Sequence, residues 1–343
     1  MNSQAPRENV QLVVLDSVLF GTAKALDYLD LEGQVMMDKI GEGILEYCFK
    51  KGFIEKSGDP QQLVNKVGSF FAENGYIGGA QMGQEGELVA VTLMDWRYLG
   101  LMKRLRKEQH FLLACPLCLA NNAVFRSNGL YGQVVYEELT PDGGFLRKYK
   151  MIHATTVSPP ESLTPSKLTN LSPVKYDGTV KVGAPAVEAV MYRLARGFEY
   201  LGAQAQVLLD RVGHGIIEFL QAEAQLTLTG NLTKDLELLS SFFKSRGLAD
   251  EIQFTVSSSR ATTGFRNYRY EPVLRTLLEE DLRLTSCPFT LTERALLRDA
   301  GWAVGASDWT LLGDKDAQLN MRLTKIVNQE FDEGKIGALM DKV

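Results

Sequence analysis

The residues best suited to chemistry in this chain are Cys115 and Cys118, which stand in the sequence Cys-Pro-Leu-Cys. They follow an apolar, strand-like run at 111–114, and the proline favours the start of a helix. A cysteine at a helix N-terminus lies at the positive end of the helix dipole, which stabilises its thiolate, and redox dithiols use this arrangement. Cys115 and Cys118 are therefore candidates for a redox or metal site. The alternative is that both are small packing residues at a helix start.

A metal site on these thiols needs further ligands, and the candidates in the same part of the chain are Cys48 and His110. There is no second C-x-x-C, so the zinc signal is weak. Four irregularly spaced cysteines are too few for a secreted disulfide framework, and a reducing compartment suits them. We expect an intracellular, cytoplasmic protein.

His214 is the histidine with the clearest candidate role. It stands between Gly213 and Gly215, where its imidazole could be an axial ligand of a tetrapyrrole metal. The alternative is a histidine on a helix surface. The glycines of this segment and of 41–43 fall inside a helical pattern, so they predict close helix packing rather than a dinucleotide site. We assign no catalytic residue.

Two further groups of side chains could bind other molecules. A basic helix over 97–107 could meet acidic lipid headgroups, an acidic partner or a propionate, although such a helix is more often only solvated. Aromatic pairs on two helices are core residues by default, but a cavity between those helices could hold an apolar ligand. The partner-binding candidates are Arg97, Arg104, Arg106 and Lys107, and the ligand-binding candidates are Phe70, Phe71, Phe242 and Phe243.

The chain repeats itself at an offset of 172 residues, which indicates a tandem duplication. Residues 34–47 reappear, with conservative changes, as 206–219. The same offset relates Ser69-Phe70-Phe71 to Ser241-Phe242-Phe243, Arg97-Tyr98 to Arg269-Tyr270 and Cys115-Pro116 to Cys287-Pro288. Because Cys118 is matched by Thr290, the second copy lacks the cysteine pair. We expect two copies of one fold in a pseudo-twofold arrangement.

Each copy reads as α+β, with an antiparallel sheet covered by helices. In the first copy the apolar spacing predicts helices followed by hairpins. The helices are expected at 10–29, 34–51, 60–75, 97–107 and 116–127, and the strands at 76–82, 87–94, 133–139 and 145–152. The expected divisions of the chain are a first domain at 1–156, a Pro/Ser/Thr-rich linker at 157–177, a second domain at 178–330 and a tail at 331–343.

Composition limits the partners. The net charge is −5, from 37 basic and 42 acidic side chains, so the chain has no basic footprint for nucleic acid. The longest apolar run, 111–120, falls short of the roughly 20 residues that a membrane-spanning helix needs, and 1–8 do not form a secretory signal. We expect no transmembrane segment. Peripheral association with a membrane stays open.

The order of elements, with an apolar run reaching Cys115-Pro116, then Gly129 and a closing hairpin, resembles the 4-vinyl reductase (hydrocarbon-binding) domain. The likeness covers roughly 19–152 and 191–324, so the chain resembles tandem proteins of this family that cyanobacteria encode near photosystem II assembly factors. The family is similar in fold to vesicle-tethering TRAPP subunits. The resemblance implies binding of a hydrophobic or chlorophyll-type tetrapyrrole ligand, or of a lipid. Members often carry cysteines in the closing hairpin, which this chain lacks at 133–153 and 303–325.

The leading hypothesis is a non-catalytic accessory or assembly factor that docks on a protein partner in photosystem II biogenesis, at the cytoplasmic face of the thylakoid. The partner would be a photosystem II subunit or assembly intermediate. The alternative is an enzyme, either a dithiol oxidoreductase using Cys115 and Cys118 or an enzyme that modifies a tetrapyrrole. A third hypothesis is a structural scaffold with filled cores.

Overall fold

The computed structural model of the 343-residue chain describes residues 9–27, 31–110, 115–140, 144–153, 177–201 and 205–326. Groups of helices and antiparallel strands follow one another along these residues, so the predicted α+β class is confirmed. Outside the described residues lie the run at 111–114, the turn at 141–143, most of the 157–177 linker and the 331–343 tail. We call residues 9–153 the first half and residues 177–326 the second half.

The first half places three helices before its first hairpin. Its elements are β1 (Val10–Gln11), α1 (Leu12–Asp27), α2 (Leu31–Lys50), α3 (Pro60–Glu73), β2 (Gly79–Glu85), β3 (Leu88–Met94), α4 (Leu99–Lys107), α5 (Pro116–Ser127), β4 (Leu130–Leu139) and β5 (Phe145–His153). Helix α3 begins as its sequence predicts, because the Asp59 carboxylate accepts hydrogen bonds from the amides of Gln61 and Gln62. The helix expected from residue 10 begins later, since Val10 and Gln11 form β1.

The second half contains the same kinds of element in the same order. They are β6 (Lys181–Val182), α6 (Ala184–Tyr200), α7 (Ala205–Glu223), α8 (Leu232–Ser245), β7 (Glu251–Val256), β8 (Arg260–Arg266), α9 (Glu271–Glu279), α10 (Pro288–Asp299), β9 (Trp302–Leu312) and β10 (Asp316–Lys325). Each half contains a four-stranded antiparallel sheet, with strand orders β2-β3-β5-β4 and β7-β8-β10-β9. The two orders correspond strand by strand.

The turn of the first hairpin is shorter than the sequence suggests. Residues 83–86 read as the turn, but Gly83 to Glu85 belong to β2, and Glu85 pairs with Leu88 across a two-residue loop. Gly86 adopts a positive φ of 62°, which a glycine allows at no steric cost. The expected four-residue turn was therefore wrong because one glycine suffices for the reversal.

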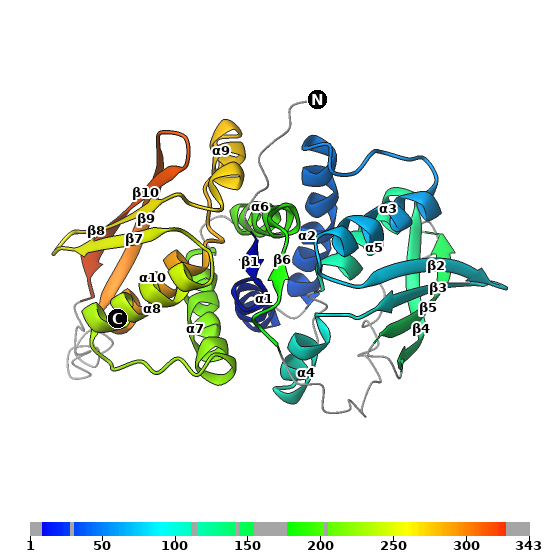
Figure 1. Cartoon of the computed structure of the whole chain (residues 1–343), viewed down its shortest axis with the longest axis horizontal. Coiled ribbons are helices and arrows are strands. Elements are labelled where there is room, and N and C mark those ends of the chain that lie inside the picture. The colour runs from blue at the N-terminus through cyan, green and yellow to red at the C-terminus, as the bar shows by residue number, and fades with distance from the viewer. Residues whose placement is uncertain are drawn as a thin grey trace, which may run out of the picture.

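The two halves meet through their first strands and helices, which lie between the two sheets (Figure 1). Strand β1 pairs antiparallel with β6, with Val10 opposite Val182. Helix α1 packs mainly against α7 of the second half, and α6 packs mainly against α2 of the first half. Almost all of the described side chains of α1 are buried, as expected for a helix covered on every side. Each half therefore covers a helix of the other.

The glycines of the two G-x-G segments permit this packing, as the sequence predicts. A Cβ on Gly41 would lie 2.1 Å from the carbonyl oxygen of Leu119, and one on Gly213 would lie 2.1 Å from that of Leu291. These two contacts join α2 to α5 and α7 to α10. A Cβ on Gly215 would come within 2.7 Å of the Cα of Gly21, at the crossing of α7 and α1. No side chain larger than hydrogen fits at these crossings.

Candidate functional site

The two cysteines of the C-x-x-C motif lie at the start of α5, as predicted. Cys115 is the N-cap residue in extended conformation, Pro116 is the first helical residue, and Cys118 follows within the first turn. Both side chains are buried, at 0% and 4% exposure. Both thiols are free, and they are in hydrogen-bonding contact with each other.

Their surroundings make the two thiols unequal. Burial raises the pKa of Cys115 well above its usual value. The pKa of Cys118 is lowered, because the Cys115 thiol donates a hydrogen bond to it and the Arg147 guanidinium lies nearby, although burial opposes this shift. The local field therefore favours a thiolate on Cys118 over one on Cys115.

Arg147 is held next to Cys118 by a buried ion pair with Glu137. The two residues face each other across β4 and β5, and Nε of Arg147 donates a hydrogen bond to Oε1 of Glu137 at 2.7 Å. Their side chains are only 8% and 6% exposed. Burial alone lowers the pKa of Arg147, but Tyr149, Cys118 and Glu137 raise it overall, so this guanidinium stays charged.

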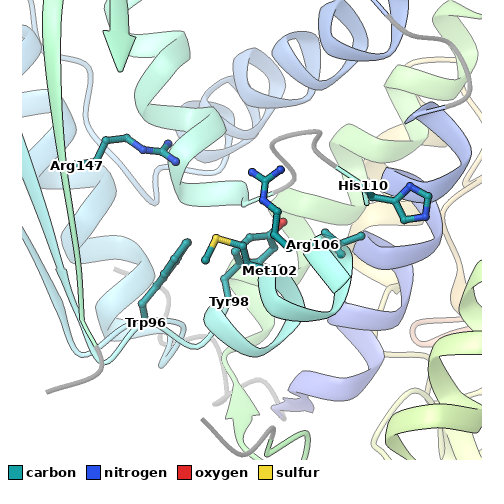
Figure 2. A pocket seen from close by; sticks show the side chains of 7 residues that line it. Trp96, Tyr98, Met102, Arg106, His110 and Arg147 are labelled. Atoms are coloured by element: carbon teal, nitrogen blue, oxygen red, sulfur yellow. The ribbon is translucent and has the colours of Figure 1, made fainter. Parts of the chain in front are cut away.

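A small pocket opens beside this cluster. It is lined by Trp96, Tyr98, Met102, Leu105, Arg106, His110 and Arg147 (Figure 2). Figure 2 shows Arg147 reaching toward the group from the sheet, with His110 on the opposite side. The cavity holds about 10 Å³, which is room for roughly one water molecule. As the side chains stand, it admits no tetrapyrrole.

The pocket is bordered by the aromatic rings of Trp96 and Tyr98 and by the polar or charged groups of Arg106, His110 and Arg147. The Trp96 ring stacks on Phe145 with centroids 4.4 Å apart. Burial lowers the pKa of Arg106, and the nearby Tyr98 and Glu137 oppose that shift. Nδ1 of His110 lies 2.8 Å from an Asp27 carboxylate oxygen, which ties the end of α4 to α1. This border suits a small polar or anionic group against an apolar body.

The second half has two tyrosines and five leucines, and no charged side chain, at the corresponding positions. At an offset of 172, the counterparts of the seven lining residues are, in the same order, Tyr268, Tyr270, Leu274, Leu277, Leu278, Leu282 and Leu319. The ion pair is replaced by Trp309 opposite Leu319, in the same register of β9 and β10. Cys287 caps α10 as Cys115 caps α5, but Thr290 replaces the second cysteine. The charged and dithiol groups of the site belong to the first half.

The aromatic ligand-binding candidates lie elsewhere, in the packed cores. Phe70 stacks on Phe53 and contacts Phe71, and Phe243 contacts Phe289 and Phe242. Phe70, Phe71 and Phe243 are buried, and Phe242 is partly buried against the same core. None of the four lines the pocket in Figure 2. Among the described residues, the pocket in Figure 2 lies at α4 in the first half, apart from these aromatic pairs.

His214 lies on the surface of α7, at the crossing with α10. Its Nδ1 lies 2.8 Å from the Asp210 carbonyl oxygen, and its Nε2 lies 2.8 Å from Oδ1 of Asp299. Both ring nitrogens therefore have protein partners. Axial ligation of a metal by His214 would require one of these contacts to break.

The four basic residues expected to bind a partner have different surroundings in the structure. Arg106 lines the pocket and Lys107 is exposed on the same helix. Arg97 forms an ion pair with Asp95. Arg104 lies within 2.5 Å of Glu108 and 4.0 Å of Glu218 and of Glu223 on α7, so it helps to join the halves. The predicted basic helix is thus not one uniform docking surface.

The other expected sites receive no support from geometry. Among the described residues, no group of three or more His, Cys, Asp or Glu side chains is placed to hold a metal ion. Cys48 is buried away from water, which raises its pKa to about 12. Within the described ranges, no helix has both the length and the apolar character needed to cross a bilayer.

Comparison with known proteins gave no match to a family model, a curated protein or a solved structure. Sequence reasoning found Cys115, Cys118 and Arg106, but missed the aromatic wall and the Arg147–Glu137 pair. Comparison of the two halves at the 172-residue offset could have indicated the ion pair, because Leu319 corresponds to Arg147 and Trp309 corresponds to Glu137.

Proposed function

We propose that this chain is an accessory protein that works by binding, with the ligand site in its first half and a structural role for its second half. In this proposal the halves are two pseudo-twofold copies of a 4-vinyl-reductase-like unit. The observation that carries it is the contrast at the pocket. A buried ion pair costs desolvation energy, and the second half packs the same positions with Leu and Trp. We therefore infer that the Arg147 and Glu137 charges in the first half serve ligand binding rather than stability.

The ligand we propose has a carboxylate and an apolar body, as a lipid-derived fatty acid or a chlorophyll-type tetrapyrrole with a free propionate does. Arg106 and Arg147 supply positive charge, and Trp96 and Tyr98 supply an apolar wall. Arginine binds carboxylates through paired hydrogen bonds. Entry requires the pocket to widen, and Met102 is the flexible side chain on its border that can move aside. The resemblance to the family adds the proposed setting, photosystem II assembly at the thylakoid surface.

The test is purification of the full chain from a cyanobacterial host, followed by absorption spectra and mass spectrometry of organic extracts and of co-purifying proteins. The Arg106→Leu variant carries the residue that the second half has at this position, so it should fold. Lys107→Ala is the control, since it removes a charge from the exposed face of the same helix.

We expect the wild type and Lys107→Ala to carry a ligand and Arg106→Leu to lose most of it. Equal ligand content in all three proteins would contradict the site. A colourless, ligand-free protein bound to photosystem II subunits would contradict the binding proposal and place the function on the surface.

A further inference from the structure

We propose that Cys115 and Cys118 form a reversible intramolecular disulfide, which gives the first half a thiol redox site. The inference is independent of the ligand proposed above. It rests on two buried thiols within the first turn of α5, on the charged Arg147 in the electrostatic surroundings of Cys118, and on Thr290 and Leu319, which replace Cys118 and Arg147 in the second half. A C-x-x-C pair at a helix start is an arrangement in which thiol exchange is fast.

The environment assigns different roles to the two thiols. In this proposal Cys118 is the attacking group, because the charged Arg147 guanidinium lies in its surroundings and favours a thiolate there. It is also slightly exposed, at 4%, whereas Cys115 is fully buried. Cys115 is the resolving thiol, since its proton is held until Cys118 has reacted.

The reaction uses a low-molecular-weight disulfide as the oxidant. The Cys118 thiolate attacks one sulfur of the oxidant, its S–S bond breaks, and the departing thiolate takes up a proton. Cys115 then loses its proton and attacks Sγ of Cys118, which releases the second thiol. The two protein thiols lose two electrons in total, and one disulfide is reduced to two thiols.

The other two cysteines provide internal controls. Cys48 and Cys287 are buried, and burial raises the pKa of each. Cys287 occupies the N-cap position that corresponds to Cys115, but Thr290 stands in place of the second thiol and Leu319 is the counterpart of Arg147. Neither control cysteine has the features that the proposal requires.

The experiment equilibrates the full chain in glutathione buffers over a range of redox ratios, quenches with acid, labels free thiols with N-ethylmaleimide in denaturant and locates them by peptide mass spectrometry. We expect Cys115 and Cys118 to lose the label together in a two-electron transition, while Cys48 and Cys287 stay labelled throughout. Labelling of all four cysteines at every ratio would overturn the proposal. Crosslinks from Cys115 or Cys118 to other chains, without the internal bond, would also overturn it.

A designed pair in the second half tests the role of Arg147. The Thr290→Cys variant creates a second C-x-x-C at the start of α10, without a neighbouring arginine. We expect this pair to oxidise about tenfold more slowly than the natural pair in the same molecule. Equal rates would overturn the assignment of Arg147 as the group that activates Cys118. Because both pairs share one protein, global unfolding would affect both of them, and the Thr290→Ser variant is the control for a local change of packing at the start of α10.

Discussion

Val10 lies opposite Val182 in the antiparallel pairing of β1 and β6, and Val182 is also the residue 172 positions further along the chain. A residue faces its own counterpart where a twofold axis that relates two copies passes between them. The β1–β6 pairing thus marks the axis of the proposed duplication. Substitutions at matching positions of the two halves can then serve as controls for each other.

The Arg147–Glu137 pair should be strongly coupled in stability. Glu137→Gln leaves a buried guanidinium without its counter-charge, so we expect a loss of about 3–5 kcal/mol. The double variant Glu137→Trp with Arg147→Leu introduces the combination found in the second half, and it should be less destabilised than the single variant. Urea unfolding of the wild type, Glu137→Trp, Arg147→Leu and the double variant gives the coupling energy. Additive losses would contradict this expectation.

Gly213 should not tolerate alanine, although alanine usually favours a helix. The added Cβ would lie 2.1 Å from the Leu291 carbonyl oxygen, which is backbone and cannot move alone. We expect Gly213→Ala to lower the free energy of unfolding by about 1–3 kcal/mol or more. Gly83→Ala is the control, because nothing lies within 4 Å of its Cβ. A control as destabilised as Gly213→Ala would show that the contact is not the cause.

Gly43 and Gly215 are matched positions at which the same substitution should have different effects. A Cβ on Gly215 meets the Gly21 backbone, whereas one on Gly43 meets the far end of the Arg193 side chain. Because a side chain can change rotamer and a helix backbone cannot, Gly215→Ala should cost more than Gly43→Ala. Thermal unfolding of the two variants compares these costs, and the reverse order would refute the explanation.

Glu293 should make the chain less stable as the pH rises. Burial raises its pKa to about 7, and Thr263 Oγ1 lies 2.8 and 2.7 Å from its two carboxyl oxygens. Between pH 4.5 and about 7 the folded chain holds a proton that the unfolded chain has released. This part of the stability is present in full below pH 4.5 and is lost as the pH rises to about 7, by about 3 kcal/mol in total.

The Glu293→Gln variant has no such proton to lose, and its first-half counterpart Asn121 is also a neutral amide. We therefore expect the variant to gain stability relative to the wild type as the pH rises from 5 to 8. Chemical unfolding at several pH values measures this difference. A difference that stays constant over this range would refute the assignment.

Local signals predicted the elements well, because they depend on neighbouring residues. Asp59-Pro60 and Cys115-Pro116 each begin a helix where expected, and the closing hairpin of the first half lies close to its predicted place. The packing partners of α1 and α6 could not be predicted, since apolar periodicity shows that a helix is buried but not what covers it.

The site was harder to predict because a bulge changes the direction of one side chain. The register of β4 shifts between Val134 and Tyr136, so two consecutive residues point outward and Glu137 turns inward toward Arg147. Simple alternation along this strand places Glu137 on the solvent face. The alternation of the sequence alone therefore could not predict the Arg147–Glu137 ion pair, which depends on the shifted register of β4 against β5.

If the halves are the two copies of the proposed duplication, the packing of α1 on α7 and of α6 on α2 makes the chain equivalent to a dimer whose two subunits are joined covalently. In a dimer of identical chains every substitution occurs twice, and assembly depends on protein concentration. A joined chain holds its two parts at a high effective concentration, and one part can change alone. Leu278 and Leu319 in one half, with Arg106 and Arg147 in the other, are differences that only the joined form can carry.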